Sequence, residues 1–281
     1  MNKKSIHLLR RSVFQLAKIA INPSRYLLPK FLSRFADQEK YHIDCFIRSI
    51  PEGNLSKVLD AGAGNFRYRK TLEEKSYRYE SQEFANSFNQ ENIDLYTYIC
   101  DIEALEISSE LFDLIICTQV LEHVPHPHKA IAELARVLKK NGRIYLTTNF
   151  LFPIHGEPFD FFRFTRFGLS KLFEEAGLEI ISIEPRGGFA AFSGKIIFEF
   201  PSVIKAKLIF GDTTPHGPRK VKVKSYLLLL FSTPFIFVLD LLFTFLAVLI
   251  ASLDFLDRKK RYTLGYQVIA QKNAEEIASQ G

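Results

Sequence analysis

Short strand-like runs alternate with helical patterns between Lys57 and about Pro185, and this alternation limits the fold more than any other feature. The runs are rich in β-branched and aromatic residues, and they read "KVLDA", "YRYESQ", "LYTYIC", "FDLIICT", "RIYLTT" and "LEIISIE". Such alternation predicts an α/β fold, with a mostly parallel sheet covered by helices on both faces. A ligand of such a sheet binds at the carboxyl ends of the strands, so a site is expected in the loops that follow them.

Two helices have clear ends in the sequence. In "HKAIAELARVLKKNG" an apolar stripe precedes Lys139 and Lys140, which suit a last helical turn, and Gly142 is expected to stop the helix. In "GLSKLFEEAG" the expected stop is Gly177.

The first strand runs into a glycine-rich loop, "VLDAGAGNF". Gly62 and Gly64 allow a tight turn and let a ligand approach the backbone. Asp60 ends the strand with a carboxylate, which suits a cationic or hydroxyl-bearing ligand better than a phosphate. A dinucleotide-binding loop would have a third glycine where this chain has Arg67, and this disfavours a dinucleotide oxidoreductase.

Polar residues follow three more strands in the positions that the same ligand would need. Glu83 ends the second strand, where a carboxylate can bind both hydroxyls of a ribose. Asp101 follows the third strand and could accept a hydrogen bond from an exocyclic amine. The fourth strand, "FDLIICT", runs into a polar end at Gln119, Glu122 and His123.

Together, "VLDAGAGNF", "SQEF", "CDIEAL" and "FDLIICTQVLEHVPHPHKAIAELARVLKKNGRIYLTTNF" resemble the class I S-adenosylmethionine-dependent methyltransferases, in particular the type 11 family. The resemblance covers roughly residues 40–186 and returns at the final strand. It implies a Rossmann-like seven-stranded sheet, mostly parallel with an antiparallel last strand, and S-adenosyl-L-methionine as the cofactor. One departure is Phe66, where the family commonly has a third glycine.

The resemblance also assigns roles to residues of the cofactor site. By this resemblance, Asp60, Gly62 and Gly64 would line the methionine part of the cofactor. Glu83 would hold the ribose hydroxyls. Asp101 and Ile102 would flank the adenine, and Gln119 would lie close to the sulfonium end. Because this cofactor has no phosphate to cradle, Phe66 is expected to reshape the loop without abolishing binding.

Candidate acceptor-side residues follow the fourth and fifth strands. His123 is a candidate general base, or it merely orients its loop. The segment "NFLFPIHGEPFDFFRFT" adds His155 and Asp160 as further candidate bases, and Arg163 to hold an anionic or sugar group. Its pattern resembles that of type 11 enzymes associated with surface glycan and lipid-linked saccharide pathways; a buried aromatic lid is the alternative. No metal site is predicted.

A 25-residue apolar run, Tyr226–Ile250, separates the sixth strand from "YTLGYQVIAQK", which is expected to be the seventh. A single membrane crossing would leave these two strands on opposite sides of the bilayer. Basic residues flank the run on both sides, namely Arg219, Lys220, Lys222 and Lys224 before it and Arg258, Lys259, Lys260 and Arg261 after it. This pattern favours both ends on the cytoplasmic face. We predict an in-plane or re-entrant anchor; the alternative is an apolar helix packed on the domain or in a dimer.

Residues 1–36 hold eight Lys or Arg and no acidic residue. Their apolar and basic residues separate onto two faces of a helix, which is typical of a segment that lies on an anionic membrane surface. A helix docked on the domain with a solvated basic face is the alternative. Such a basic arm could also bind nucleic acid, but the apolar insertion makes lipid the favoured partner.

The sequence therefore predicts four parts: a basic amphipathic arm (1–36), a methyltransferase domain (37–186 and 261–273), a hydrophobic membrane-associating helical insertion (187–260) between strands six and seven, and a tail (274–281). Three widely spaced cysteines indicate a reducing cytosol. The expected function is O-methylation of a glycan, lipid-linked saccharide or lipid intermediate, by a cytoplasmic enzyme attached peripherally or monotopically to the membrane. A catalytically inactive scaffold or regulatory protein is the alternative; retention of Asp60, Glu83 and Asp101 speaks against it. The oligomeric state has no signal in the sequence.

Overall fold

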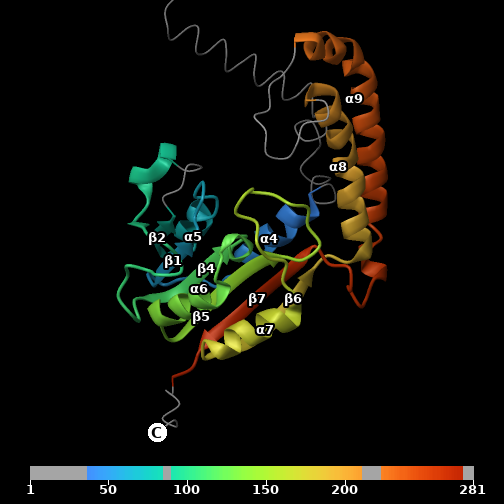
Figure 1. Ribbon diagram of the computed structural model, residues 1–281. Helices are drawn as coiled ribbons and strands as arrows, with labels where there is room; N and C mark the ends of the chain where they lie inside the picture. The colour runs from blue at the N-terminus through green and yellow to red at the C-terminus, as the bar shows by residue number, and fades with distance from the viewer. Residues whose placement is uncertain (1–36, 85–89, 211–222, 275–281) are drawn as a thin grey trace, which may run out of the picture. The chain divides into compact units, whose positions relative to one another are not determined.

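A computed structural model describes residues 37–84, 90–210 and 223–274, without the side chains of residues 90–92, 205–210 and 223–234. The predicted N-terminal arm and nearly all of the predicted tail lie outside these residues. The chain divides into two compact units, which are described separately (Figure 1). We call His42–Gly187 with Tyr262–Gly281 the sheet unit, and Met1–Tyr41 with Gly188–Arg261 the helical unit.

The sheet unit contains a seven-stranded sheet in the order β3-β2-β1-β4-β5-β7-β6. Its strands are β1 (Lys57–Ala61), β2 (Arg78–Glu83), β3 (Tyr98–Ile99), β4 (Phe112–Thr118), β5 (Leu138–Asn149), β6 (Leu178–Arg186) and β7 (Gly265–Lys272). Strands β1 to β5 pair in parallel, whereas β7 lies antiparallel between β5 and β6. The predicted α/β fold and the antiparallel last strand are confirmed.

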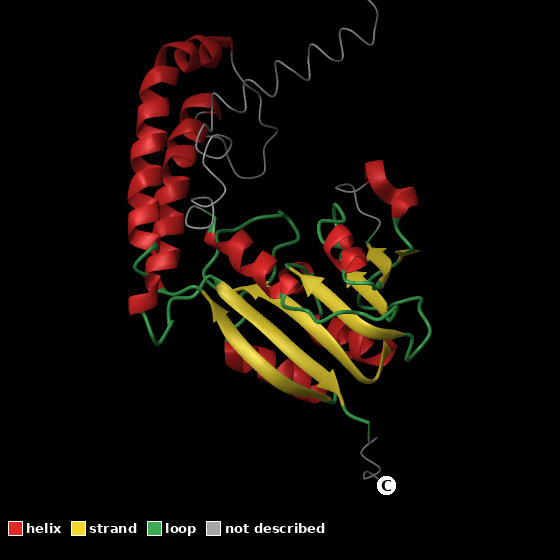
Figure 2. Ribbon diagram, turned by 180° about the vertical axis from the view of Figure 1, so that it is seen from behind, coloured by secondary structure: helices red, strands yellow, loops and turns green. Residues whose placement is uncertain are grey.

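Helices cover both faces of the sheet (Figure 2). One face carries α4 (Gln38–Arg48) and α5 (Arg69–Glu74), and the other carries α6 (Pro127–Val137) and α7 (Arg166–Glu175). Side chains of successive strand residues point to opposite faces. Val58 accordingly packs in the α4 and α5 layer, while Leu59 packs in the α6 and α7 layer. Three short 3₁₀ helices complete the described elements: η1 (Gln90–Leu95), η2 (Leu121–His123) and η3 (Asp254–Leu256).

The predicted end of α6 is wrong. The helix stops at Val137, and Leu138 already pairs with Phe112 as the first residue of β5. Lys139 lies in this strand, where its ammonium group donates to both carboxylate oxygens of Asp113 at 2.9 and 3.0 Å. Pairing with β4 thus takes the chain out of the helix before the two lysines. The predicted stop of α7 is confirmed, since Gly177 follows it with φ of 72°.

The helical unit contains two long helices, α8 (Phe189–Phe210) and α9 (Val223–Ala251). They run antiparallel, because Gly194 of α8 approaches Ala247 and Ala251 of α9, while Phe200 stacks on Phe243 at 5.2 Å between ring centroids. Beyond α9, the Asp254 carboxylate accepts hydrogen bonds from the amides of Gly188 and Ala191, which closes the base of this helical hairpin. Among the described residues, Phe235–Leu256 is the one helical stretch long and apolar enough to cross a membrane, by length and composition alone.

Gly265 is the position of the sheet where a side chain is least tolerable. A Cβ there would overlap the carbonyl oxygen of Thr148 and the buried guanidinium of Arg186. We expect Gly265→Ala to lower the free energy of unfolding by about 3 kcal/mol or more, because backbone on one side leaves little room to relax. The matched control is Gly177→Ala, which meets open space and carries only the strain of a positive φ, about 1 to 2 kcal/mol. Thermal unfolding followed by circular dichroism measures both; equal losses would contradict the expectation.

Candidate active site

The strand register brings the predicted cofactor residues to one edge of the sheet. Ala61 pairs with Gln82 on one side and with Cys117 on the other, so β1, β2 and β4 end at the same level. The loop after β1, Glu83 at the end of β2 and Gln119 after β4 therefore lie along the carboxyl edge. Parallel sheets bind ligands at this edge.

The two glycines of the loop after β1 have different roles. Gly62 has φ of 70°, its Cβ would strike the side chain of Val120, and its amide donates to the side chain of Gln82 at 3.1 Å. Gly64 has φ of 53°, and no heavy atom of the described residues lies within 4 Å of where its Cβ would be. Gly62 is thus fixed by packing, whereas the backbone at Gly64 is open to a ligand.

Glu83 and Phe66 hold this loop in place. The Gly64 amide donates to the Glu83 carboxylate at 2.7 Å, and the Tyr96 hydroxyl donates to the Gly64 carbonyl at 2.6 Å. Phe66, at the position of the family's third glycine, has φ of 53° and packs its ring on Tyr96 with centroids 4.7 Å apart. The loop therefore keeps a left-handed residue there without glycine, and the aromatic contact offsets the strain.

Asp60 is a buried carboxylate with one neutral partner. Its side chain is 2% exposed and accepts a hydrogen bond from the Tyr79 hydroxyl at 2.7 Å. Burial raises the pKa of Asp60 to about 7, an effect that the Tyr79 hydrogen bond opposes and the nearby Glu83 increases. A cationic group bound beside Asp60 would favour its ionised form.

The remaining predicted cofactor residues lie in three different environments. Asp101 is exposed and accepts a hydrogen bond from the amide of Glu103 at 2.9 Å. Ile102 is buried in the core on the α6 and α7 face. Gln119, with φ of 58°, donates to the Thr147 hydroxyl at 3.0 Å. Their contacts with adenine or with the sulfonium stay predictions.

A second buried carboxylate, Glu122, lies just after β4 on η2. It is fully buried, and its two oxygens accept hydrogen bonds from Thr148 at 2.7 Å and Asn149 at 2.8 Å. The buried Arg186 guanidinium donates to the Thr148 carbonyl at 2.7 Å and to the Asn149 side chain at 3.1 Å. Burial raises the pKa of Glu122, while Thr148, His123 and Arg186 act in the opposite direction.

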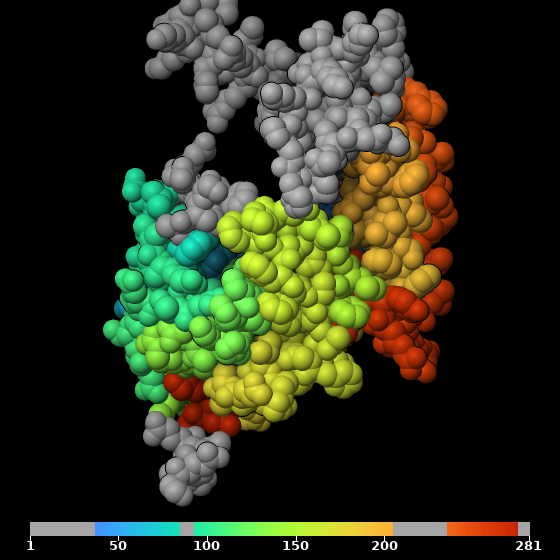
Figure 3. Space-filling model, viewed as in Figure 1, coloured from blue at the N-terminus to red at the C-terminus, as the bar shows by residue number. Residues whose placement is uncertain are grey.

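Asp160 and Arg163 clasp the loop that follows β5. The Arg163 guanidinium donates to both Asp160 oxygens, at 2.6 and 2.8 Å, and to the carbonyls of Phe152 and Pro153 at 3.1 and 3.0 Å. Arg163 holds the pKa of Asp160 well below its usual range, which makes this carboxylate a poor proton acceptor near neutral pH. Asp160 also accepts from the backbone amide of His155 at 2.9 Å. The clasped segment forms a large part of the visible face of the sheet unit (yellow-green in Figure 3).

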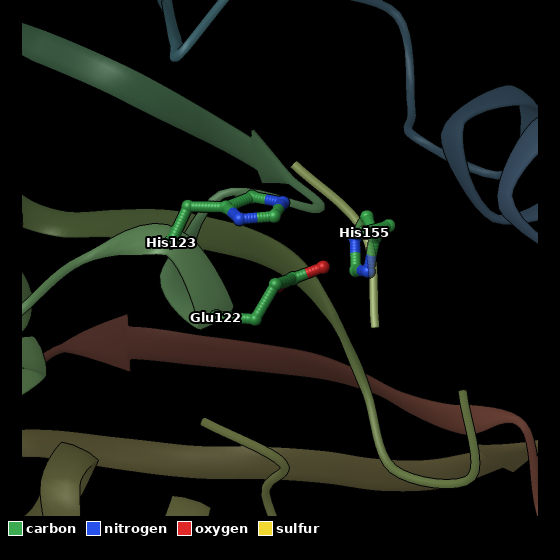
Figure 4. Close-up of side chains that lie close together, drawn as sticks. All are labelled: Glu122, His123 and His155. Carbon is green, nitrogen blue, oxygen red and sulfur yellow. The ribbon is translucent and has the colours of Figure 1, made fainter. Parts of the chain in front are cut away.

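This clasp places His155 beside His123 and Glu122 (Figure 4). The two imidazole rings meet edge to face with centroids 4.7 Å apart. Nδ1 of His123 bonds the Phe159 carbonyl at 2.5 Å, and Nδ1 of His155 bonds the Pro153 carbonyl at 3.2 Å. Burial first, and His123 second, lower the pKa of His155 below its ordinary value, so the ring is neutral near pH 7. Two predicted residues thus come together around a third that was not in the predicted set.

Comparison with known families decides what kind of domain carries this site. Residues 59–146 match the model of a type 11 methyltransferase domain. The chain contains a class I methyltransferase domain of the type 11 family. The matched residues extend from β1 into β5 and include Asp60, both loop glycines, Glu83 and the cluster residues on η2. The predicted family is confirmed, and with it S-adenosyl-L-methionine as the cofactor of the methyltransferase domain.

Relatives of known name match the methyltransferase domain over short stretches. A ubiquinone biosynthesis O-methyltransferase of Photobacterium profundum is 37% identical over 60 residues, which are 19% of this chain and 26% of that protein. A ubiquinone biosynthesis O-methyltransferase of Coxiella burnetii is 33% identical over 63 residues, which are 22% of this chain and 27% of that protein. The chain thus spans about a quarter of the length of these curated relatives. An uncharacterized protein of Methanocaldococcus jannaschii is 33% identical over 107 residues, 38% of this chain and 50% of that one.

Solved structures share the fold of the methyltransferase domain at low sequence identity. The [4+2]-cyclase SpnF has a TM-score of 0.50 at 17% identity, covering 83% of this chain and 80% of its own. The structure of a complex between the Haloferax volcanii Trm112 methyltransferase activator and the putative methyltransferase has a TM-score of 0.51 at 14% identity, covering 87% and 98%. The first of these proteins is named as a cyclase, so the fold by itself leaves the reaction open.

Four residues around the acceptor side were not among the predicted site residues: Glu122, Thr148, Asn149 and Arg186. Glu122 follows β4 and Asn149 is the last residue of β5, and a polar residue at the end of a buried strand is a usable signal. Arg186 offered none, because a charged residue at the end of an edge strand ordinarily lies in solvent. The roles of His123, His155, Asp160 and Arg163 in the methyltransferase domain stay predictions.

The buried Asp60 should lower the stability of the methyltransferase domain at neutral pH. With a native pKa of about 7 against an ordinary 3.8, the native state keeps a proton that the unfolded chain has released, so stability falls as pH rises from 4 to 7. We expect Asp60→Asn, which keeps an acceptor for Tyr79, to raise the free energy of unfolding by up to about 4 kcal/mol at pH 8 and by far less at pH 5. Thermal unfolding at both pH values measures the gain. A variant no more stable than wild type at pH 8 would contradict the assignment of Asp60 as a penalised buried acid.

Proposed function

We propose that this protein is an S-adenosylmethionine-dependent methyltransferase that O-methylates a glycan, a lipid-linked saccharide or a lipid intermediate at a membrane surface. The observation that carries the proposal is the placement of two groups along one edge of the sheet. The first is the cofactor loop with Asp60 and Glu83, and the second is the cluster of Glu122, His123 and His155. The same edge thus offers a place for a methyl donor and polar groups for an acceptor.

The residues present fit the cofactor. Asp60 is a buried carboxylate suited to the amino group of the methionine part, and the open backbone at Gly64 allows close approach. Glu83 lies at the end of β2, where it can accept from ribose hydroxyls while keeping its bond to the Gly64 amide. The bound cofactor supplies an electrophilic methyl group on a sulfonium, so positioning of the acceptor is the main task left to the protein.

The acceptor atom that suits the site is oxygen. A hydroxyl must lose a proton as it is methylated, and the imidazoles of His123 and His155 are groups that can assist that loss. Asp160 is less suited, because Arg163 occupies both of its oxygens. The ubiquinone biosynthesis relatives are named as O-methyltransferases, which supports the same atom.

The hairpin of α8 and α9 supports membrane attachment, because its polarity is inverted relative to that of a water-soluble helix pair. Along α9 the buried residues recur at intervals of three or four and include two polar ones: Ile236, Asp240, Thr244, Ala247 and Ala251. Among the described side chains of the same helix, the exposed ones are large and apolar: Phe235, Phe237, Val238, Leu241, Leu242, Phe245, Leu246 and Leu249. A helix in water shows the opposite arrangement, whereas this one suits lipid.

Both ends of the hairpin belong on one side of the membrane. The chain enters it from β6 and leaves it toward β7, and these two strands are paired along their length. Exposed Arg258, Lys259 and Arg261 follow the hairpin and suit contact with anionic headgroups. An acceptor that resides in the membrane would then be delivered to an enzyme already held there.

Cofactor binding should depend on pH through Asp60. Calorimetric titration of the detergent-solubilised full chain with S-adenosylmethionine and with S-adenosylhomocysteine should give about fivefold to tenfold tighter binding at pH 8 than at pH 6, because Asp60 must be ionised to pair with the amino group of either ligand. Asp60→Asn should bind both ligands more weakly and lose the pH dependence. No binding by well-folded wild-type protein at either pH would overturn the proposed activity and favour the inactive scaffold.

Membrane attachment is tested by flotation of purified protein with anionic vesicles. Phe245 is 68% exposed on α9, so Phe245→Glu would place a charge in lipid and should reduce the floated fraction severalfold. The matched control is Phe167→Glu on α7, a side chain 76% exposed outside the hairpin, which should float like wild type. Equal flotation of both variants would contradict lipid contact at this face of α9.

A further inference from the structure

We propose that Glu122, His123 and His155 form a binding site for a divalent first-row transition-metal ion. One potential ligand atom from each of the three side chains lies within 4.8 Å of the other two. The three side chains point into a common space, two of them from η2 and one from the loop after β5 (Figure 4). Two imidazoles and one carboxylate are a ligand set that such ions favour over Mg²⁺ or Ca²⁺, which prefer oxygen alone.

Both imidazoles are oriented by a backbone carbonyl that bonds their Nδ1 atom. A carbonyl oxygen can only accept, so Nδ1 of His123 must donate to the Phe159 carbonyl and Nδ1 of His155 to the Pro153 carbonyl. In the neutral rings this leaves Nε2 with a lone pair. Metal-binding histidines are typically oriented by this kind of bond from the other ring nitrogen.

The carboxylate is equally well prepared. Thr148 and Asn149 each donate to one oxygen of Glu122, and every carboxylate oxygen has a second lone pair that can bind a cation. The Arg186 guanidinium donates a hydrogen bond to the side-chain oxygen of Asn149 and so holds this side chain in place. Glu122 is fully buried, and a cation bound beside it would offset the cost of burying the charged carboxylate.

The arrangement needs only a small contraction to bind an ion. Ligand atoms at about 2.1 Å from one ion lie about 3 to 3.4 Å from each other, so the widest separation must close by about 1.5 Å. His155 can supply this movement, because its side chain is 32% exposed and its bond to Pro153 is long, at 3.2 Å. His123 is the fixed partner, since even a Cβ on Gly156 would come within 3.0 Å of its ring.

Three protein ligands leave coordination positions for an acceptor. An acceptor with two adjacent oxygens, such as a vicinal diol or a hydroxyl beside a carbonyl, could fill them. The ion would lower the pKa of the bound hydroxyl, and the proton would pass to water. This role in acceptor activation rests on the proposed O-methyltransferase function, whereas metal binding itself does not.

The test is titration of tag-free, chelator-treated full-length protein with Co²⁺, followed by its visible absorption, with Zn²⁺ as competitor. We expect one Co²⁺ per chain, displaced by Zn²⁺. His155→Ala and His123→Ala should each weaken binding by at least about tenfold. The matched control is the double variant His126→Ala with His128→Ala, a second histidine pair that lies outside the cluster and should leave binding unchanged.

Two results would overturn the metal site: no stoichiometric Co²⁺ binding by folded protein, or loss of binding in the control to the same extent as in the cluster variants. Circular dichroism of each variant shows that it is folded, and His155→Ala, in a loop, is the one least exposed to misfolding. Calorimetry with S-adenosylmethionine on the same metal-free sample separates the two proposals. Cofactor binding without Co²⁺ binding would contradict the metal site alone. Co²⁺ binding without cofactor binding would contradict the proposed methyltransferase activity alone.

Discussion

The hydrogen bonds of the buried Arg186 guanidinium are the interaction on which the sheet unit depends. These bonds to Thr148 and Asn149 connect the end of β6 to the end of β5, and Asn149 in turn donates a hydrogen bond to Glu122. Gly265 of β7 must lack a side chain for this guanidinium to fit between the strands. A charged group so buried is strongly destabilising when a partner is lost, so three strands and the polar side of the candidate site are fixed together.

The same residue explains how the sheet tolerates a long insertion. The Arg186 carbonyl accepts hydrogen bonds from the Thr263 hydroxyl at 2.9 Å and from the Leu264 amide at 3.2 Å. The chain thus leaves the sheet and returns to it at residues that are bonded to each other. Because the two ends are tied at this point, the length and chemistry of what lies between them could change without disturbing the pairing of β6 with β7.

The predictable part of this molecule is the part encoded locally. The run "FDLIICT" predicts the observed bounds of β4, and the glycines with Asp60 identify the loop after β1. The local pattern predicts the wrong end for α6, because Lys139 suits a last helical turn in sequence but forms an ion pair with Asp113 from within β5. The burial of Arg186 and the approach of His155 to His123 depend on contacts between residues far apart in the chain, which no local pattern reports.

The inverted polarity of α9 belongs to this second kind of information. In sequence, Asp240 within the apolar run would be costly at the bilayer centre and tolerable near the interface. In the structure Asp240 is buried on the stripe that also carries Ala247 and Ala251, the residues that Gly194 of α8 approaches. In the described part of α9 the polar Asp240 and Thr244 are therefore buried, whereas most of the large apolar side chains are exposed. A hairpin built in this way can place its outer face in lipid while its two ends stay bonded at Arg186 on one side, so the paired strands β6 and β7 never need to be separated by the membrane.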